Sequence, residues 1–222
     1  MTERGMIFNS EMVRAILDGR KTQTRRPIKF PFKDRNLGCE LSGNELAGEL
    51  SAGNYLNSPF GKPGDRIWVR ETFQGPLFDF DQMDAYCKDS TPFEKAQFCV
   101  YKADGKPAPE FFDADDNLHC CWRPSIHMPR WASRITLEIT DARVERLNAI
   151  SEEDARAEGI IDGGCLNCGE PEPCACANPE PDATDAFACL WQSIYGQENW
   201  NANPWVWVIE FKRIKGADHA IN

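Results

Sequence analysis

The stretch WVWVIEFKRI, residues 205–214, decides the fold class of this chain. It alternates and is rich in β-branched and aromatic residues, which predicts a strand near the middle of a sheet. Working outward, RITLEIT at residues 134–140 and RIWVRET at residues 66–72 have the same character, with further candidates at 97–102 and 142–147. In residues 66–72 the pattern predicts two faces, one carrying Ile67, Val69 and Glu71 and the other Trp68, Arg70 and Thr72.

Short helices are predicted between these strands. Residues 10–18 carry an apolar face at helical spacing, and Ser151 begins a capping-box-like helix that Gly159 ends. Residues 185–195 predict a further helix, whose apolar face comprises Phe187, Leu190, Trp191 and Ile194. Strands separated by short helices favour an α+β fold, a small mixed β-barrel with helices over its ends.

The segments between these elements are expected to be loops. Residues 20–27 lack apolar periodicity and are predicted to form a polar, basic loop after the first helix. Residues 36–64 are rich in Gly, Asn and Ser and are predicted to be a connecting loop. The length of 222 residues fits a single domain, residues 1–222, that carries long insertions.

The charge of the chain is unevenly distributed. The net charge is −10, but residues 1–36 contain nine lysines and arginines and only four acids. The acidic body argues against extensive binding to a phosphate backbone, whereas the basic segment suits a local anionic ligand or, equally, a solvated helix end. No run of about 18 apolar residues and no signal-peptide core is present in the sequence, so we expect a cytoplasmic protein that does not engage a membrane.

Four of the ten cysteines form a cluster with metal-ligand spacing. The pattern is C-x-x-C followed after five residues by C-x-C, and four thiolates suit tetrahedral Zn²⁺. Because all four ligands would be cysteines, no coordination site stays open. The metal would therefore be structural, holding an irregular loop in place, and no metal is expected to take part in catalysis. The alternative is a loop whose thiols stay reduced. The predicted ligands are Cys165, Cys168, Cys174 and Cys176.

The stretch GRKTQTRR, residues 19–26, resembles the G-x-K-x-x-(E/T)-x-R signature of the ASCH domain family, matched by Gly19, Lys21, Thr24 and Arg26. Three further features resemble that family in the expected order. They are the turn and strand PGDRIWVRE at 63–71, the helix with Ser151, Ala155, Glu158 and Gly159, and the strand WVWVIEF at 205–211. Residues 27–60, 74–130 and 162–183 would be insertions, a layout similar to larger ASCH proteins of phages and prophages.

The resemblance implies a PUA-like barrel with a cleft for RNA or a modified nucleoside. Compact bacterial members of the family include amidohydrolases that remove the acetyl group from N(4)-acetylcytidine. Matched motif to motif, the catalytic set would be Lys21, Thr24 and Glu158, with Gly19 and Arg26 at the ligand. Trp68 and Arg70, which share a predicted strand face, are candidates for stacking against a base.

The chemistry of this set is consistent with amide hydrolysis. Thr24 is a candidate nucleophile, Lys21 a base if burial or neighbouring arginines lower its pKa, and Glu158 an orienting or proton-shuttling carboxylate. Four readings stay open: an RNA or nucleoside reader without chemistry, a hydrolase of an acylated pyrimidine nucleoside, a ribonuclease using Lys21 and Arg26, and an interaction protein displaying the cysteine loop. Each residue also has a structural alternative as an ordinary loop or helix-end side chain.

Overall fold

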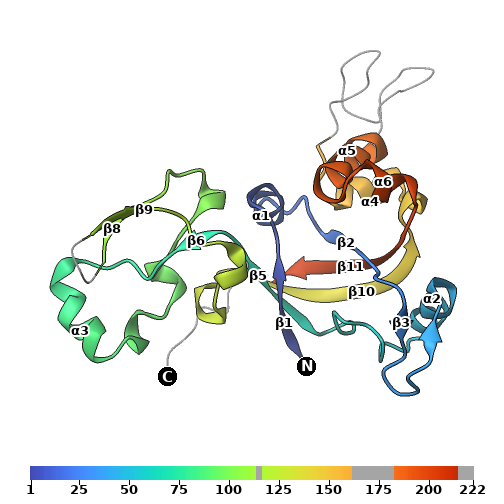
Figure 1. Cartoon of the computed structure of the whole chain (residues 1–222), viewed down its shortest axis with the longest axis horizontal. Coiled ribbons are helices and arrows are strands. Elements are labelled where there is room, and N and C mark those ends of the chain that lie inside the picture. Colours follow the sequence, from blue (N-terminus) through green and yellow to red (C-terminus); the bar gives the residue numbers. More distant parts are fainter. Residues whose placement is uncertain (114–116, 162–182, 215–222) are drawn as a thin grey trace, which may run out of the picture. The chain divides into compact units, whose positions relative to one another are not determined.

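The computed structural model describes residues 1–113, 117–161 and 183–214. It divides into two compact units, each discontinuous in sequence (Figure 1). Unit 1 comprises Met1–Leu17, Arg66–Glu138 and the chain from Arg213, and unit 2 comprises Asp18–Asp65 and Ile139–Lys212. The principal sheet has the strand order β1-β5-β10-β11-β2, and β10 contributes residues to both units. The predicted α+β class is confirmed, whereas the single domain stays a prediction.

Unit 1 contains the first helix and two of the predicted strands. Strand β1 (Glu3–Ile7) pairs in parallel with β5 (Arg66–Arg70), and β5 pairs antiparallel with the start of β10 (Thr136–Arg146). In β5 the predicted faces are confirmed, since Ile67 and Val69 are buried while Trp68 and Arg70 are half-buried. Helix α1 (Ser10–Leu17) also confirms its prediction, with Val13 and Ile16 in the core.

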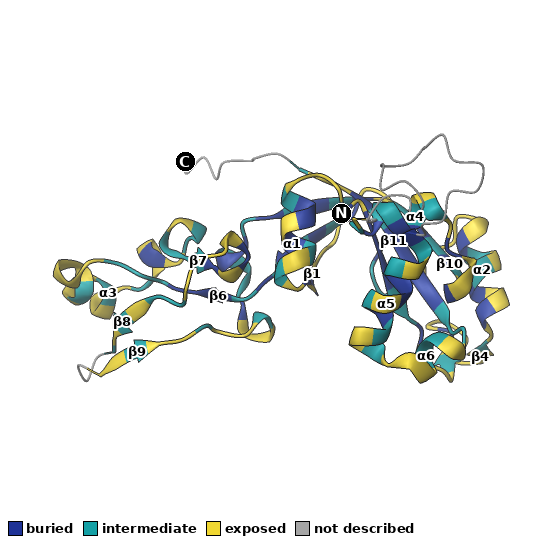
Figure 2. Ribbon diagram, turned by 90° about the horizontal axis from the view of Figure 1, so that it is seen from above, coloured by how far each residue is buried: buried dark blue, intermediate teal, exposed yellow. Residues whose placement is uncertain are grey.

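The rest of unit 1 consists of short elements. Strands β6 (Phe73–Gln74) and β7 (Val100–Tyr101) pair, as do β8 (Glu110–Phe112) and β9 (Leu118–Cys120), and α3 (Met83–Lys88) buries no side chain (Figure 2). The strand predicted at 97–102 is only two residues long, because a 3-10 turn precedes it. The 3-10 turns of unit 1 are Phe80–Gln82, Thr91–Phe93, Ala96–Phe98, Lys102–Asp104, Ser125–His127 and Arg130–Ala132.

In unit 2 the central strand is β11 (Trp205–Arg213), which lies between β10 and β2 (Gln23–Pro27) and confirms the prediction of a strand inside a sheet. The loop predicted at 20–27 is therefore wrong in part: residues 23–27 pair antiparallel with β11. The strands predicted at 134–140 and 142–147 are one strand, β10. Its buried positions change phase between Ile139 and Ala142, which makes the sequence pattern look like two strands.

The predicted connecting loop at 36–64 contains regular structure. Strands β3 (Phe32–Lys33) and β4 (Glu40–Leu41) form a small pair, and α2 (Gly43–Ser51) follows. Ser42 and Glu45 form a capping box at the start of α2, and Leu46 and Leu50, four residues apart, are buried. The prediction was wrong because the glycine- and serine-rich composition conceals this cap and this apolar spacing.

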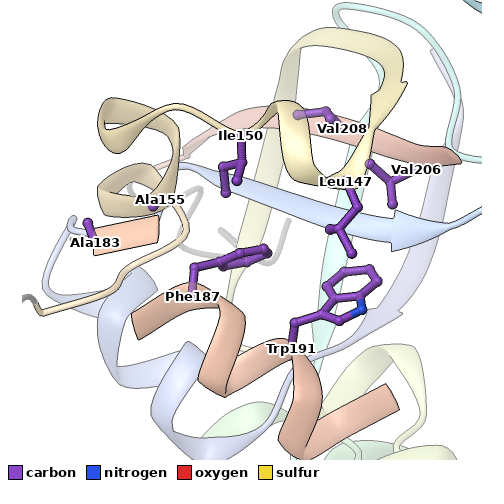
Figure 3. Packing of buried hydrophobic residues seen from close by; sticks show 8 residues of the cluster. All are labelled: Leu147, Ile150, Ala155, Ala183, Phe187, Trp191, Val206 and Val208. Atoms are coloured by element: carbon purple, nitrogen blue, oxygen red, sulfur yellow. The ribbon is translucent and has the colours of Figure 1, made fainter. Parts of the chain in front are cut away.

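Helices α4 (Glu152–Ala157), α5 (Ala183–Tyr195) and α6 (Gln197–Asn201) pack in unit 2, after the 3-10 turn Leu147–Ala149. Ser151 accepts a hydrogen bond from the Asp154 amide and caps α4, as predicted. Phe187 and Trp191 of α5 point toward a cluster of apolar side chains that includes Leu147 (Figure 3). Ile194, predicted to lie on the apolar face of this helix, is 46% exposed. None of the described helices is long and apolar enough to cross a membrane.

Candidate functional site

Backbone pairing brings the start of β2 against the end of α4. The amide of Thr22 donates to the Ala157 carbonyl at 2.8 Å, and Lys21 forms an antiparallel bridge with Glu158. Glu158 is the C-cap of α4, and Gly159 follows with a φ of +88°, which lets the chain turn away from the helix. This backbone pairing therefore brings together Lys21 and Glu158, which lie 137 residues apart in sequence.

The side chains of Lys21 and Glu158 form a buried ion pair. Lys21 Nζ lies 2.6 Å from Glu158 Oε2 and also donates to the Glu158 carbonyl oxygen at 2.8 Å. The exposed fractions of the two side chains are 0% and 3%. Burial lowers the pKa of Lys21, partly opposed by the charge and hydrogen bond of Glu158, while the charges of Arg26 and Arg25 add to the lowering. The lowered lysine pKa that the sequence argument required is therefore present.

The second oxygen of Glu158 faces Arg25, whose guanidinium is fully buried. Arg25 Nη1 lies 3.3 Å from Glu158 Oε1, and Arg25 Nη2 lies 2.6 Å from Glu145 and 2.7 Å from Asp154. Its carbon Cζ also lies 5.9 Å from the ring centre of Phe187. Glu158 is thus held from both sides, by Lys21 at one oxygen and by Arg25 at the other.

Further polar groups extend this arrangement across three strands and α4. Gln23 donates to Asp154 at 3.1 Å and to Glu210 at 3.2 Å, and its own carbonyl oxygen accepts from Arg25. Arg143 of β10 pairs with Glu145, Asp154 and Glu210. We call the set the charge cluster; it comprises the cations Lys21, Arg25 and Arg143 and the carboxylates Glu145, Asp154, Glu158 and Glu210.

The other motif residues of β2 occupy different positions. Thr24 is buried and pairs with Ile209, and strand alternation puts its side chain on the opposite face of β2 from Gln23 and Arg25. Arg26 is half-buried on the face of Thr24 and contributes its charge to the lowered pKa of Lys21. Gly19 has a φ of +81°, a conformation that favours glycine, so it serves the turn that leads into Lys21.

Trp68 and Arg70 belong to unit 1, whereas Lys21 and Glu158 belong to unit 2. Arg70 Cζ lies 5.4 Å from the ring centre of Trp68, and Arg130 Cζ lies 6.0 Å from it. A side chain at Gly5 would clash with Trp68, since a Cβ there would lie 2.7 Å from the indole. The predicted sharing of one strand face by Trp68 and Arg70 is confirmed, and their role toward a ligand stays a prediction.

The four predicted zinc ligands, Cys165, Cys168, Cys174 and Cys176, lie outside the described residues. Over the ranges that the structure does describe, no group of three or more His, Cys, Asp or Glu side chains is arranged to hold a metal ion. The zinc site therefore stays a prediction from the sequence.

The sequence pointed to Arg25 only as one of the neighbouring arginines that could lower the pKa of Lys21, and it gave no indication of Gln23, Glu145 and Asp154 as members of the site. A signal was present: Lys21, Gln23 and Arg25 recur every second residue, as do Asp141, Arg143 and Glu145. Polar and charged residues with a period of two indicate strands whose polar faces meet, a pattern that a search for apolar periodicity overlooks.

Comparisons with known proteins returned no relative. No protein-family model matches the chain, and no curated protein and no solved structure matches it either.

Proposed function

We propose that unit 2 binds a modified nucleoside and hydrolyses an N-acyl group from its base, as in N(4)-acetylcytidine. The observation that carries this proposal is the buried Lys21–Glu158 pair, in which a lysine with a lowered pKa lies 2.6 Å from a carboxylate. A perturbed lysine beside a carboxylate is typical of acid–base chemistry, although ion pairs that only hold a fold together also shift pKa values. The resemblance of residues 19–26 to the ASCH signature supports the same assignment.

The proposed reaction uses Lys21 as base and then as acid. The neutral amine of Lys21 takes a proton from the nucleophile, either a water molecule or the hydroxyl of Thr24, and the oxygen of that nucleophile attacks the carbonyl carbon of the acyl group. The bond between that carbon and the exocyclic nitrogen breaks, and the leaving amine takes the proton back from Lys21. With water as the nucleophile the carboxylic acid is released directly, whereas with Thr24 a second water molecule hydrolyses the acyl ester. Glu158 stabilises Lys21 while it carries the proton.

The charge cluster favours a neutral ligand group over a phosphate backbone. Its three cations are matched by four carboxylates within the protein, so little positive charge remains for a polyanion. Arg20, which precedes Lys21, is likewise paired with Asp18 at 3.1 Å. This balance weakens the expectation that Lys21 serves as a phosphate ligand and supports chemistry on an uncharged amide.

The test is to incubate the purified chain with N(4)-acetylcytidine and to measure the release of cytidine by chromatography. We expect Lys21→Met and Glu158→Gln to lose at least about 100-fold in kcat/KM, the range of general acid–base catalysis. Lys29→Met is the matched control, because Lys29 is exposed on the same segment, and it should keep wild-type activity. Circular dichroism of each variant verifies folding.

Thr24 is tested separately because its side chain lies across β2 from Arg25. Thr24→Ser should retain part of the activity and Thr24→Val should lose it; activity of Thr24→Val would assign the nucleophile to water. A wild-type chain that binds the nucleoside without releasing cytidine would identify a reader rather than a hydrolase. Cleavage of RNA abolished by Lys21→Met would identify a ribonuclease instead.

We further propose that the five-stranded sheet is the wall of a PUA-like barrel. The supporting observation is the ordered recurrence of the four family-like segments, three of which correspond to β2, β5 and β11 and one to α4. A solved structure with β1 hydrogen-bonded to β2 would establish closure of the barrel, and an open sheet edge would refute it.

A further inference from the structure

We propose that Arg25 is a positioning residue of the hydrolytic site, holding Oε1 of Glu158 so that Oε2 is directed at Lys21. This inference rests on the proposed function. Arg25 lies outside the four motif positions Gly19, Lys21, Thr24 and Arg26, so the resemblance gives no reason to single it out. Its contacts within the charge cluster set it apart.

The first step is geometric. Arg25 Nη1 is 3.3 Å from Glu158 Oε1, while Lys21 Nζ is 2.6 Å from Oε2, so one carboxylate bridges two cations. A carboxylate held at only one oxygen can rotate about its terminal bond, whereas contacts at both oxygens fix its plane. The guanidinium is itself fixed by Glu145 and Asp154 at 2.6 and 2.7 Å. Glu158 is therefore anchored to a rigid group.

The second step is electrostatic. Arg25 carries a permanent positive charge in the same buried region as Lys21, and this charge opposes protonation of the lysine amine. Its effect is moderated by the carboxylates that neutralise it, chiefly Glu145. Removing the charge of Arg25 and removing the charge of Glu145 should therefore shift the protonation equilibrium of Lys21 in opposite directions. In the part of the chain that the structure describes, the charged groups that act on this site come from four elements. They are Arg25 and Arg26 of β2, Arg143 and Glu145 of β10, Asp154 of α4 with its C-cap Glu158, and Glu210 of β11.

The experiment compares pH profiles of kcat/KM for N(4)-acetylcytidine hydrolysis. Because Lys21 acts as a base, the rate rises with pH through the Lys21 pKa. In Arg25→Gln a positive charge is lost, so the rising limb should move to higher pH. In Glu145→Gln the charge of Arg25 is less neutralised, so the limb should move to lower pH.

Arg25→Lys separates charge from geometry. The limb should stay close to that of the wild type because the charge remains, while kcat falls about 10- to 100-fold because an ammonium does not reproduce the fork of a guanidinium. Arg146→Gln is the matched control: Arg146 is exposed at the end of β10 and bonds the Asn203 carbonyl, so both kcat and the limb should be unchanged.

A readout independent of turnover is the NMR titration of Lys21, assigned by the signal that disappears in Lys21→Met. It should show the same shifts in Arg25→Gln and Glu145→Gln. If the wild type releases no cytidine, the proposed function fails, while the titration still tests the role of Arg25. If Arg25→Gln does not fold, Arg25→Lys and Glu145→Gln carry the test. Unmoved limbs and an unmoved Lys21 titration in the folded variants would overturn the inference and leave Arg25 a purely structural residue.

Discussion

Replacing the buried ion pair with apolar residues should separate its contribution to stability from its contribution to chemistry. In Glu158→Leu the ammonium of Lys21 loses its carboxylate in a site where the lysine side chain is 0% exposed. Removing one partner of a buried pair costs about 3–5 kcal/mol in free energy of unfolding. This cost has an upper bound, because Lys21 can lose its proton instead of staying charged. Deprotonating a lysine of pKa about 10.4 at pH 7 costs about 1.4 kcal/mol per pH unit, so the bound is about 4–5 kcal/mol.

Lys21→Met should cost less, about 2–3 kcal/mol, since Arg25 still faces Glu158 Oε1 at 3.3 Å and the carboxylate is not left unpaired. The double variant Lys21→Met with Glu158→Leu removes both charges and should lie within about 1–2 kcal/mol of the wild type. Arg25 remains paired with Glu145 and Asp154 in that variant. The two substitutions are therefore predicted to be strongly non-additive.

The assay is urea denaturation followed by circular dichroism between pH 7 and pH 10. In Glu158→Leu the folded state holds Lys21 neutral while the unfolded state binds its proton, so stability should rise with pH, with a slope approaching about 1.4 kcal/mol per pH unit. In the wild type, too, the free energy of unfolding should rise with pH, because the pKa of Lys21 is lowered in the folded state. The contribution of Lys21 to stability is complete above about pH 10.4 and is lost as the pH falls through the lowered pKa. A double variant as unstable as Glu158→Leu, or a flat pH dependence for Glu158→Leu, would refute this reasoning.

Further predictions concern the core, a cap, a buried acid and the metal. Leu147→Ala should lower the free energy of unfolding by about 2–5 kcal/mol in urea denaturation, whereas Ile194→Ala, at 46% exposure, should change it by no more than about 0.5 kcal/mol. Ser42→Ala should cost about 0.5–2 kcal/mol by the same measurement, because the α2 cap is lost. Burial raises the pKa of Glu71 despite its pairing with Arg134. The contribution of Glu71 to stability is therefore complete below about pH 4.3 and is lost as the pH rises through the raised pKa. Glu71→Gln should remove this pH dependence from melting curves recorded over a range of pH. Metal analysis of freshly purified protein should find about one zinc per chain, removed by serine substitution at the four cysteines within 165–176.

The elements that were predictable from sequence are those whose apolar pattern matches their burial. Residues 205–209 are apolar without interruption because β11 lies inside the sheet and Val206–Ile209 are all buried. In β5, Ile67 and Val69 mark the buried face. The Ser151 cap could be predicted because a serine followed by acidic residues is typical of the start of a helix. Local chemistry was sufficient in these places.

The error at residues 20–27 arose because burial there is achieved with polar and charged side chains. Strand β2 buries Gln23 and Arg25 against carboxylates contributed by α4 and β10, residues more than 100 positions away in sequence. A method that looks for apolar periodicity assigns such a strand to solvent, because the partners that neutralise its charges are invisible until the chain folds. The pairing of Lys21 with Glu158 was anticipated only through the resemblance to a family motif.

A structural explanation of the charge cluster competes with the catalytic one, and the two make different demands on its members. Strand register needs specification, since a slip of one residue between β2 and β11 would move Arg25 to the opposite face, away from Glu145 and Asp154. That purpose is served by Arg25 and Gln23 without any ammonium at Lys21. A lysine held at 0% exposure beside one carboxylate, with a second cation opposing its protonation, adds nothing to register and costs desolvation. The proton equilibrium of Lys21 is therefore the property that distinguishes a site from a scaffold.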